Sequence, residues 1–115
     1  MPIKIVTDKI SLEELRRLAN ERFGDMVKAV VDIERKIMAV GGQMHADEEA
    51  LLLQKDSEQC NLWGINIYPD KSVEDYIEFD SVINLRPAQN NKTRGVDDPK
   101  IQEKIKQVVY ELYSR

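Results

Sequence analysis

Two short stretches of the sequence carry side chains that could bind a ligand, and the two are alike. Residues 65–69 read Ile-Asn-Ile-Tyr-Pro, and residues 83–87 read Ile-Asn-Leu-Arg-Pro. Apolar and polar residues alternate in both, so two strands would place the polar side chains on one face of a sheet. That face would carry two amides, a phenol and a guanidinium, from Asn66, Tyr68, Asn84 and Arg86. We expect this face to bind a ligand; alternatively, the amides bond to each other or to a loop backbone.

A basic segment follows the second stretch. Residues 86–95 contain Arg86, Lys92 and Arg94 and no acid, so they contribute +3 to a chain whose net charge is −4 and leave −7 for the rest. Guanidinium groups, amides and free backbone N–H groups ahead of a helix are the donors that bind a phosphate or carboxylate. The alternatives are solvated surface charges or a salt bridge between subunits, and Asp97 and Asp98 compete for the same N–H groups.

The single histidine, His45, is the remaining candidate for chemistry. It precedes Asp47, Glu48 and Glu49, so an acid–base role in a small hydrolase or nuclease, together with Arg86, is one hypothesis. A hydrogen-bonded structural histidine is the alternative. The spacing matches no metal-binding motif, and we expect no metal and no cofactor. Whether the protein is an enzyme is left open.

Composition limits the class of protein. At 115 residues, with 42% hydrophobic and 33% charged residues, the chain forms one domain over residues 1–115. The negative net charge disfavours nucleic-acid binding, and no apolar run is long enough to span a membrane. A lone cysteine, Cys60, cannot form an internal disulfide, so we expect a cytoplasmic protein.

Capping and turn residues indicate the elements that must position these side chains. Ser11 and Glu14 predict a capping box at the start of a helix, and Asp98 and Pro99 predict the start of another. Apolar spacing and β-branched residues then predict a strand at Ile3–Thr7, a helix at Leu12–Phe23, a hairpin at Met26–Val40, a helix at Ala46–Gln54 capped by Asp47, strands within Leu62–Pro69 and Tyr76–Leu85, and a helix at Pro99–Tyr113.

This order of elements is typical of an α+β fold. We expect a single antiparallel or mixed sheet of about five strands. The N-terminal and C-terminal helices would pack on one face of that sheet, and the helix at Ala46–Gln54 could cover the other.

Several of these segments together resemble a small prokaryotic domain family of uncharacterised function. The likeness rests on His45-Ala46-Asp47, on Leu62–Pro69, on residues 83–87 and on Val96-Asp97-Asp98-Pro99. It implies a compact cytosolic domain and supplies no activity, substrate or catalytic residue. The leading hypothesis is therefore a ligand-binding or accessory domain that recognises an anionic group. Pairing of the basic segment with the acidic residues 70–80 of a second copy, as a homodimer, is the alternative.

Overall fold

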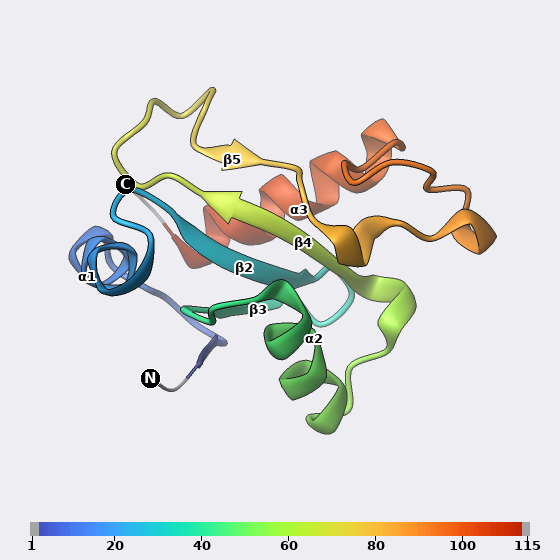
Figure 1. Cartoon of the computed structure of the whole chain (residues 1–115), viewed down its shortest axis with the longest axis horizontal. Coiled ribbons are helices and arrows are strands. Elements are labelled where there is room, and N and C mark those ends of the chain that lie inside the picture. The colour runs from blue at the N-terminus through green and yellow to red at the C-terminus, as the bar shows by residue number, and fades with distance from the viewer. Residues whose placement is uncertain (1–2, 114–115) are drawn as a thin grey trace.

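A computed structural model describes residues 3–113, which form one antiparallel sheet and three α-helices (Figure 1). The elements in chain order are β1 (Lys4–Val6), α1 (Leu12–Arg22), β2 (Val27–Asp32), β3 (Ile37–Val40), α2 (His45–Gln54), β4 (Leu62–Ile67), β5 (Ile77–Glu78) and α3 (Pro99–Leu112). The strand order across the sheet is β1-β3-β2-β4-β5, and every neighbouring pair is antiparallel. The predicted α+β class and the five-stranded antiparallel sheet are confirmed.

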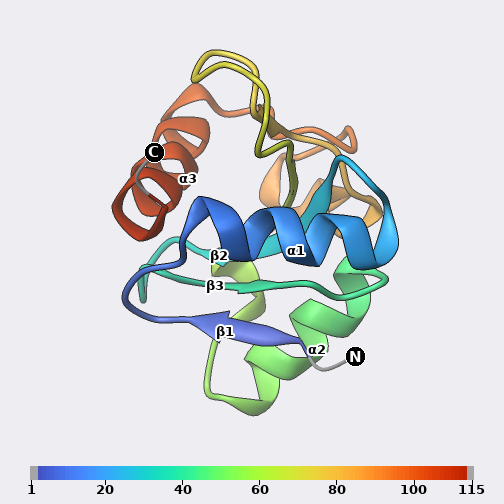
Figure 2. The same cartoon turned by 90° about the vertical axis from the view of Figure 1, so that its left-hand side faces the viewer.

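The two faces of the sheet are covered by different helices. Alternate residues of β2 and β4, such as Ala29 and Ile65, point into the main core together with buried side chains of α1 and α3. The opposite face carries a smaller cluster that includes Val30 and Leu62 with Leu52 of α2. Figure 2 shows α3 and α2 on opposite sides of the sheet. Packing of the two terminal helices on one face is therefore confirmed, and α2 covers part of the other.

The helix boundaries follow from their caps. The Ser11 hydroxyl accepts a hydrogen bond from the Glu14 N–H at 3.1 Å, and the Asp98 carboxylate accepts one from the Lys100 N–H at 2.9 Å. Each cap satisfies a donor that the first turn of a helix leaves without a partner. The Glu14 carboxylate does not close the expected capping box, because it accepts hydrogen bonds from Arg17.

One predicted cap is wrong. The helix α2 begins at His45, and its N-cap residue is Met44, whose side chain makes no capping hydrogen bond. Asp47 lies inside the first turn, where its negative charge still favours the helix dipole. The first turn of α2 therefore keeps N–H groups that no side chain caps.

The predicted second strand over Tyr76–Leu85 is also wrong in most of its length. Only Ile77–Glu78 pairs with β4, and Val82–Asn84 forms a 3₁₀ turn in which the Ile83 N–H donates to the Ser81 hydroxyl. Within this turn Ile83 packs toward α2, while Leu85 is 45% exposed. The repeated Ile-Asn motif therefore marks a strand in one copy and a turn in the other.

Candidate functional site

The Asn84 side chain takes the place of a strand along the edge of β4. Its amide accepts a hydrogen bond from the Gly64 N–H at 2.8 Å and donates to the Gly64 carbonyl at 2.9 Å. It also donates to the Arg94 carbonyl at 3.0 Å, and the whole residue is buried. These bonds occupy both ends of the amide, so Asn84 acts as a structural link between β4 and the basic segment. The amide-to-backbone alternative drawn from the sequence matches this geometry.

Arg86 is held at the start of β4. Its guanidinium donates to the carbonyl oxygens of Gln59 and Leu62 and lies 4.2 Å from the centre of the Trp63 ring. Burial lowers the pKa of this guanidinium, while Glu49 partly offsets the effect. Because Asn66 and Ile65 lie toward the other end of β4, Arg86 is separated from Asn66 and from His45, whose ring contacts Ile65. Its proposed joint role with His45 stays a prediction.

The basic segment is internally braced. The Asn91 amide donates to the carbonyl oxygens of Asn84, Thr93 and Gly95, and the Asp97 carboxylate accepts from the Lys92 N–H. Two of its cations are exposed on the surface, Lys92 and Arg94. Arg94 forms an ion pair with Asp80, with 2.8 Å between Nε and Oδ1. Arg94 of the basic segment thus pairs with one of the acidic residues 70–80 within the chain, and pairing of these segments between two copies stays a prediction.

A row of polar side chains crosses three strands on the face that α2 partly covers. Lys28 on β2 lies opposite Asn66 on β4, which lies opposite Glu78 on β5. The Asn66 amide donates to Glu78 Oε1 at 2.8 Å, and the Tyr68 hydroxyl donates to the same oxygen at 3.0 Å. We call Lys28, Asn66 and Glu78 the polar row. It runs from a cation through an amide to a carboxylate.

His45, the first residue of α2, overhangs this row. Its Nε2 atom lies 2.8 Å from the carbonyl oxygen of Ile65, the residue beside Asn66. A carbonyl oxygen only accepts, so Nε2 carries the proton, and in the neutral ring Nδ1 remains an acceptor. Burial lowers the pKa of the imidazole most, and Lys28 and Arg94 lower it further against the opposing effects of the Ile65 carbonyl and Asp80. His45 is therefore neutral near pH 7.

Glu48 lies one turn further along α2 and is fully buried. Its Oε2 atom accepts a hydrogen bond from the Gly42 N–H at 2.9 Å, whereas Oε1 is buried without a partner among the described residues. Burial raises the pKa of this carboxyl well above its usual range, although the Gly42 N–H and Lys28 oppose the rise. The carboxyl is therefore held toward its neutral form, so it does not cancel the charge of Lys28.

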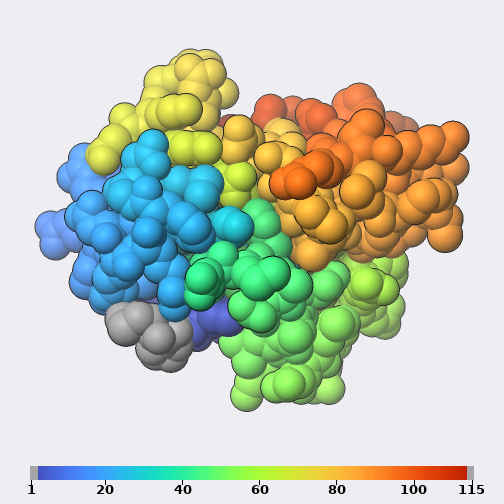
Figure 3. All heavy atoms as spheres, viewed as in Figure 1, coloured from blue at the N-terminus to red at the C-terminus, as the bar shows by residue number. Residues whose placement is uncertain are grey.

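Figure 3 shows the face of the molecule that α2 partly covers. Segments of β2, α2, β4 and residues 79–97, which are distant in the sequence, adjoin near its centre. A surface hollow borders the acidic end of the polar row; it is lined by Tyr68, Lys71, Ser72, Glu74, Asp75, Ile77 and Glu78. The arrangement offers a cation and several acceptors within one small area.

The structure brings some predicted site residues together and separates others. His45, Tyr68 and Arg94 lie around the polar row, of which Asn66 is a member. Asn84 and Arg86 are bonded instead to backbone groups: Asn84 to Gly64 of β4, and Arg86 to the carbonyl oxygens of Gln59 and Leu62. Lys28 and Glu78 were missed as site residues. Lys28 interrupts an apolar run of residues that predicts a strand. A charged residue inside such a run was the signal that could have identified Lys28 as a site residue.

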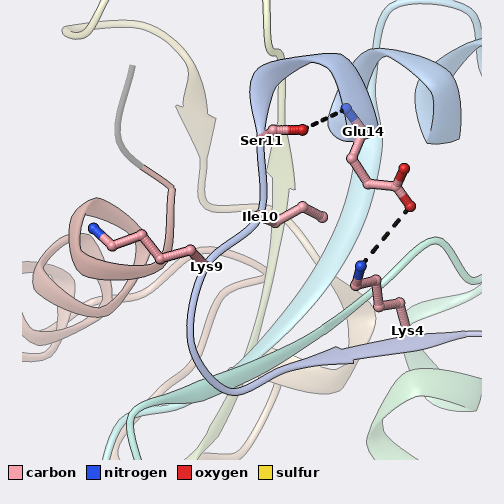
Figure 4. A pocket seen from close by; sticks show the side chains of 5 residues that line it. All are labelled: Lys4, Lys9, Ile10, Ser11 and Glu14. Carbon is pink, nitrogen blue, oxygen red and sulfur yellow. Dashed lines mark hydrogen bonds and ion pairs between the residues drawn. The ribbon is translucent and has the colours of Figure 1, made fainter.

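Another hollow, between β1 and the start of α1, offers less chemistry (Figure 4). It is lined by Lys4, Lys9, Ile10, Ser11 and Glu14. Lys4 Nζ lies 4.0 Å from the Glu14 carboxylate, and the Ser11 hydroxyl is used as a helix cap. Within residues 3–113, no group of three or more His, Cys, Asp and Glu side chains could hold a metal ion. No helix in the same range is long and apolar enough to cross a membrane.

The fold and the site define a class: a small α+β domain whose antiparallel sheet carries a polar row beside a helix that lacks a side-chain cap. Residues 4–112 match the family model described as "Protein of unknown function (DUF5674)", and the chain belongs to this family. Comparison with the curated proteins and with the solved structures finds no match. The family assignment agrees with the resemblance to an uncharacterised family and carries no activity with it.

Proposed function

We propose that this chain is a small-molecule-binding domain that recognises a phosphate- or carboxylate-bearing ligand at the polar row. The observation that carries the proposal is Lys28, a half-buried lysine that forms no ion pair with any described carboxylate. Its ammonium lies 5.2 Å from the centre of the Phe23 ring. A half-buried cation without a counter-ion favours an anion from outside the chain.

Three further features support this choice. The first turn of α2 has no side-chain cap, so its N–H groups add a positive partial charge beside the row. The Glu48 carboxyl, with its raised pKa, adds little opposing charge. Arg94 is exposed and near enough to His45 to affect its pKa, so it adds a cation at the margin whose charge Asp80 partly offsets.

The proposal revises the residues expected from the sequence. Lys28 replaces Arg86 as the principal anion-binding group, Asn66 and His45 remain, and Lys92 and Arg94 become peripheral cations. A cytoplasmic, prokaryotic setting belongs to the same proposal, and the free, exposed Cys60 supports the reducing compartment alone. A homodimer joined by acidic and basic segments has less support, because Arg94 and Asp80 pair within the chain.

The test is a titration of isotope-labelled protein with sodium phosphate and, separately, sodium acetate, each against sodium chloride at equal ionic strength. We expect saturable amide shifts at Lys28, His45 and Asn66 with at least one of the two anions. Lys28→Met should weaken that binding about tenfold, the loss of one charge-assisted contact. The matched control is Lys106→Met, because Lys106 is also half-buried and lies on α3, behind the sheet.

Shifts that do not saturate, or that Lys28→Met leaves unchanged, would overturn the proposal. The two anions separate the possible sources of the charge, since phosphate and acetate differ in charge and in geometry. Folding of each variant is checked by the dispersion of its own amide spectrum before binding is compared.

A further inference from the structure

The polar row holds acceptors that no described donor satisfies. Asn66 is 6% exposed, and its Oδ1 atom is buried without a hydrogen-bond partner, although its amide nitrogen is bound to Glu78. An unsatisfied buried acceptor is costly, so such an oxygen in a native site indicates a missing donor. His45 adds a second acceptor, because its Nε2 atom donates to the Ile65 carbonyl and leaves Nδ1 with a lone pair.

The far end of the row is anionic. Glu78 is exposed, and both of its described donors, Asn66 and Tyr68, contact the same oxygen, Oε1. Glu78 also lines the hollow beside Tyr68. A ligand that satisfied Lys28 alone would leave Asn66 Oδ1 and His45 Nδ1 without a donor and the charge of Glu78 without a described cation.

We infer that the ligand carries a hydrogen-bond donor, an ammonium or hydroxyl group, close to its anionic group. This inference rests on the proposed function and names the class of ligand for the same site. The anion would lie at Lys28 and the first turn of α2, and the donor at Asn66 and Glu78. Neighbouring strands lie about 5 Å apart, so the donor should be about 5 Å from the anion. Two carbon atoms between a phosphate ester oxygen and an amine provide that separation.

Matched probes test this inference directly. Ethyl phosphate, 2-hydroxyethyl phosphate and phosphoethanolamine share one phosphate monoester and differ in the donor that they carry. We expect the native chain to bind phosphoethanolamine about tenfold more tightly than ethyl phosphate, the difference that one satisfied buried acceptor makes. The hydroxyl probe separates the two sources of the donor, because it lacks the positive charge that Glu78 would attract.

Two variants assign the preference to the row. Asn66→Ala removes the buried acceptor, and Glu78→Gln removes the charge at an exposed position where folding is not at risk. Both should reduce the preference for phosphoethanolamine over ethyl phosphate toward unity, and this ratio of the two affinities is the readout. Asn20→Ala, at an exposed position of α1, is the control for loss of an asparagine amide.

The outcomes separate the two proposals. If no probe binds to the native chain, the proposed function fails. If all three probes bind equally, the anion site stands and the inference about the donor is wrong. A preference that survives both Asn66→Ala and Glu78→Gln would also overturn it, because the donor would then be recognised elsewhere.

Discussion

Replacing Asn84 by alanine should destabilise the fold strongly without touching the ligand site. The amide makes three hydrogen bonds of 2.8, 2.9 and 3.0 Å from a fully buried position. At about 1 kcal/mol for each bond, the free energy of unfolding should fall by about 3 kcal/mol. The buried N–H and carbonyl groups of Gly64 would also lose their partners, so this value is a lower bound.

Urea unfolding followed by the fluorescence of the single tryptophan, Trp63, measures this loss. For a chain of this size, about 3 kcal/mol corresponds to a decrease in Tm of roughly 12 °C. Asn20→Ala, in an exposed turn of α1, should change the stability by less than about 0.5 kcal/mol. A loss below about 1 kcal/mol in Asn84→Ala would refute the assignment of this amide as a structural link.

The isosteric variant Asn84→Asp sharpens the test. One carboxylate oxygen could still accept from the Gly64 N–H, but the other would face the Gly64 and Arg94 carbonyls, to which the amide now donates. Only the protonated acid could bond to these carbonyls, so the folded state should favour protonation. The variant should therefore gain stability relative to the native chain as the pH falls toward 4, and a difference between the two chains that does not change with pH would contradict the geometry.

Two other substitutions test the packing around the site. Glu48→Gln should remove a pH dependence of the stability. Because burial raises the pKa of Glu48, the free energy of unfolding of the native chain falls as the pH rises above the ordinary carboxyl value of about 4.3. The variant should escape this loss, which is about 1.4 kcal/mol for each unit by which the pKa is raised. Urea unfolding at pH 4 and pH 8 measures this, Glu103→Gln is the exposed control, and an equal difference at both pH values would exclude the expected protonation. Gly64→Ala should cost about 2 kcal/mol, because its new Cβ would lie 2.5 Å from the Cβ of Ser81. Ser81→Gly in the same chain should recover part of that loss, and a neutral Gly64→Ala variant would show that the turn can move away.

The sequence predicted the parts of the fold that local interactions determine. The caps at Ser11 and Asp98 and the apolar stripes behind them identified α1 and α3 nearly to the residue. The β-branched runs on either side of residues 33–36 identified the β2–β3 hairpin. These signals act within a few residues, so no knowledge of distant contacts was needed.

The second Ile-Asn motif failed because its meaning depends on a distant partner. Three alternating residues fit a strand or a 3₁₀ turn equally well. The backbone of Val82–Asn84 turns because the Asn84 side chain, rather than its main chain, pairs with Gly64 twenty residues away. A pattern search within one segment cannot distinguish a side-chain amide that binds a strand from one that binds a ligand.

The candidate site was predicted in part for a related reason. His45 and Asn66 were identified by residue type, but Lys28 and Glu78 became site residues only through strand register. Register across β2, β4 and β5 joins positions that lie up to fifty residues apart in the sequence. Without that pairing, a single lysine in an apolar run gave no reason to connect it with an asparagine on another strand.

The way in which the first half of β4 is closed has a consequence for self-association. A strand with free N–H and carbonyl groups along its edge is a template for pairing with another chain. Beyond the short β5, this margin is occupied by two side chains: the amide of Asn84 binds both backbone groups of Gly64, and Arg86 donates to the Leu62 carbonyl. These side chains satisfy the backbone groups of β4 as a neighbouring strand would, but they present no backbone edge with which a further strand could pair. Loss of either side chain should expose unpaired backbone groups at the edge of β4, so we expect variants at these two positions to aggregate during refolding.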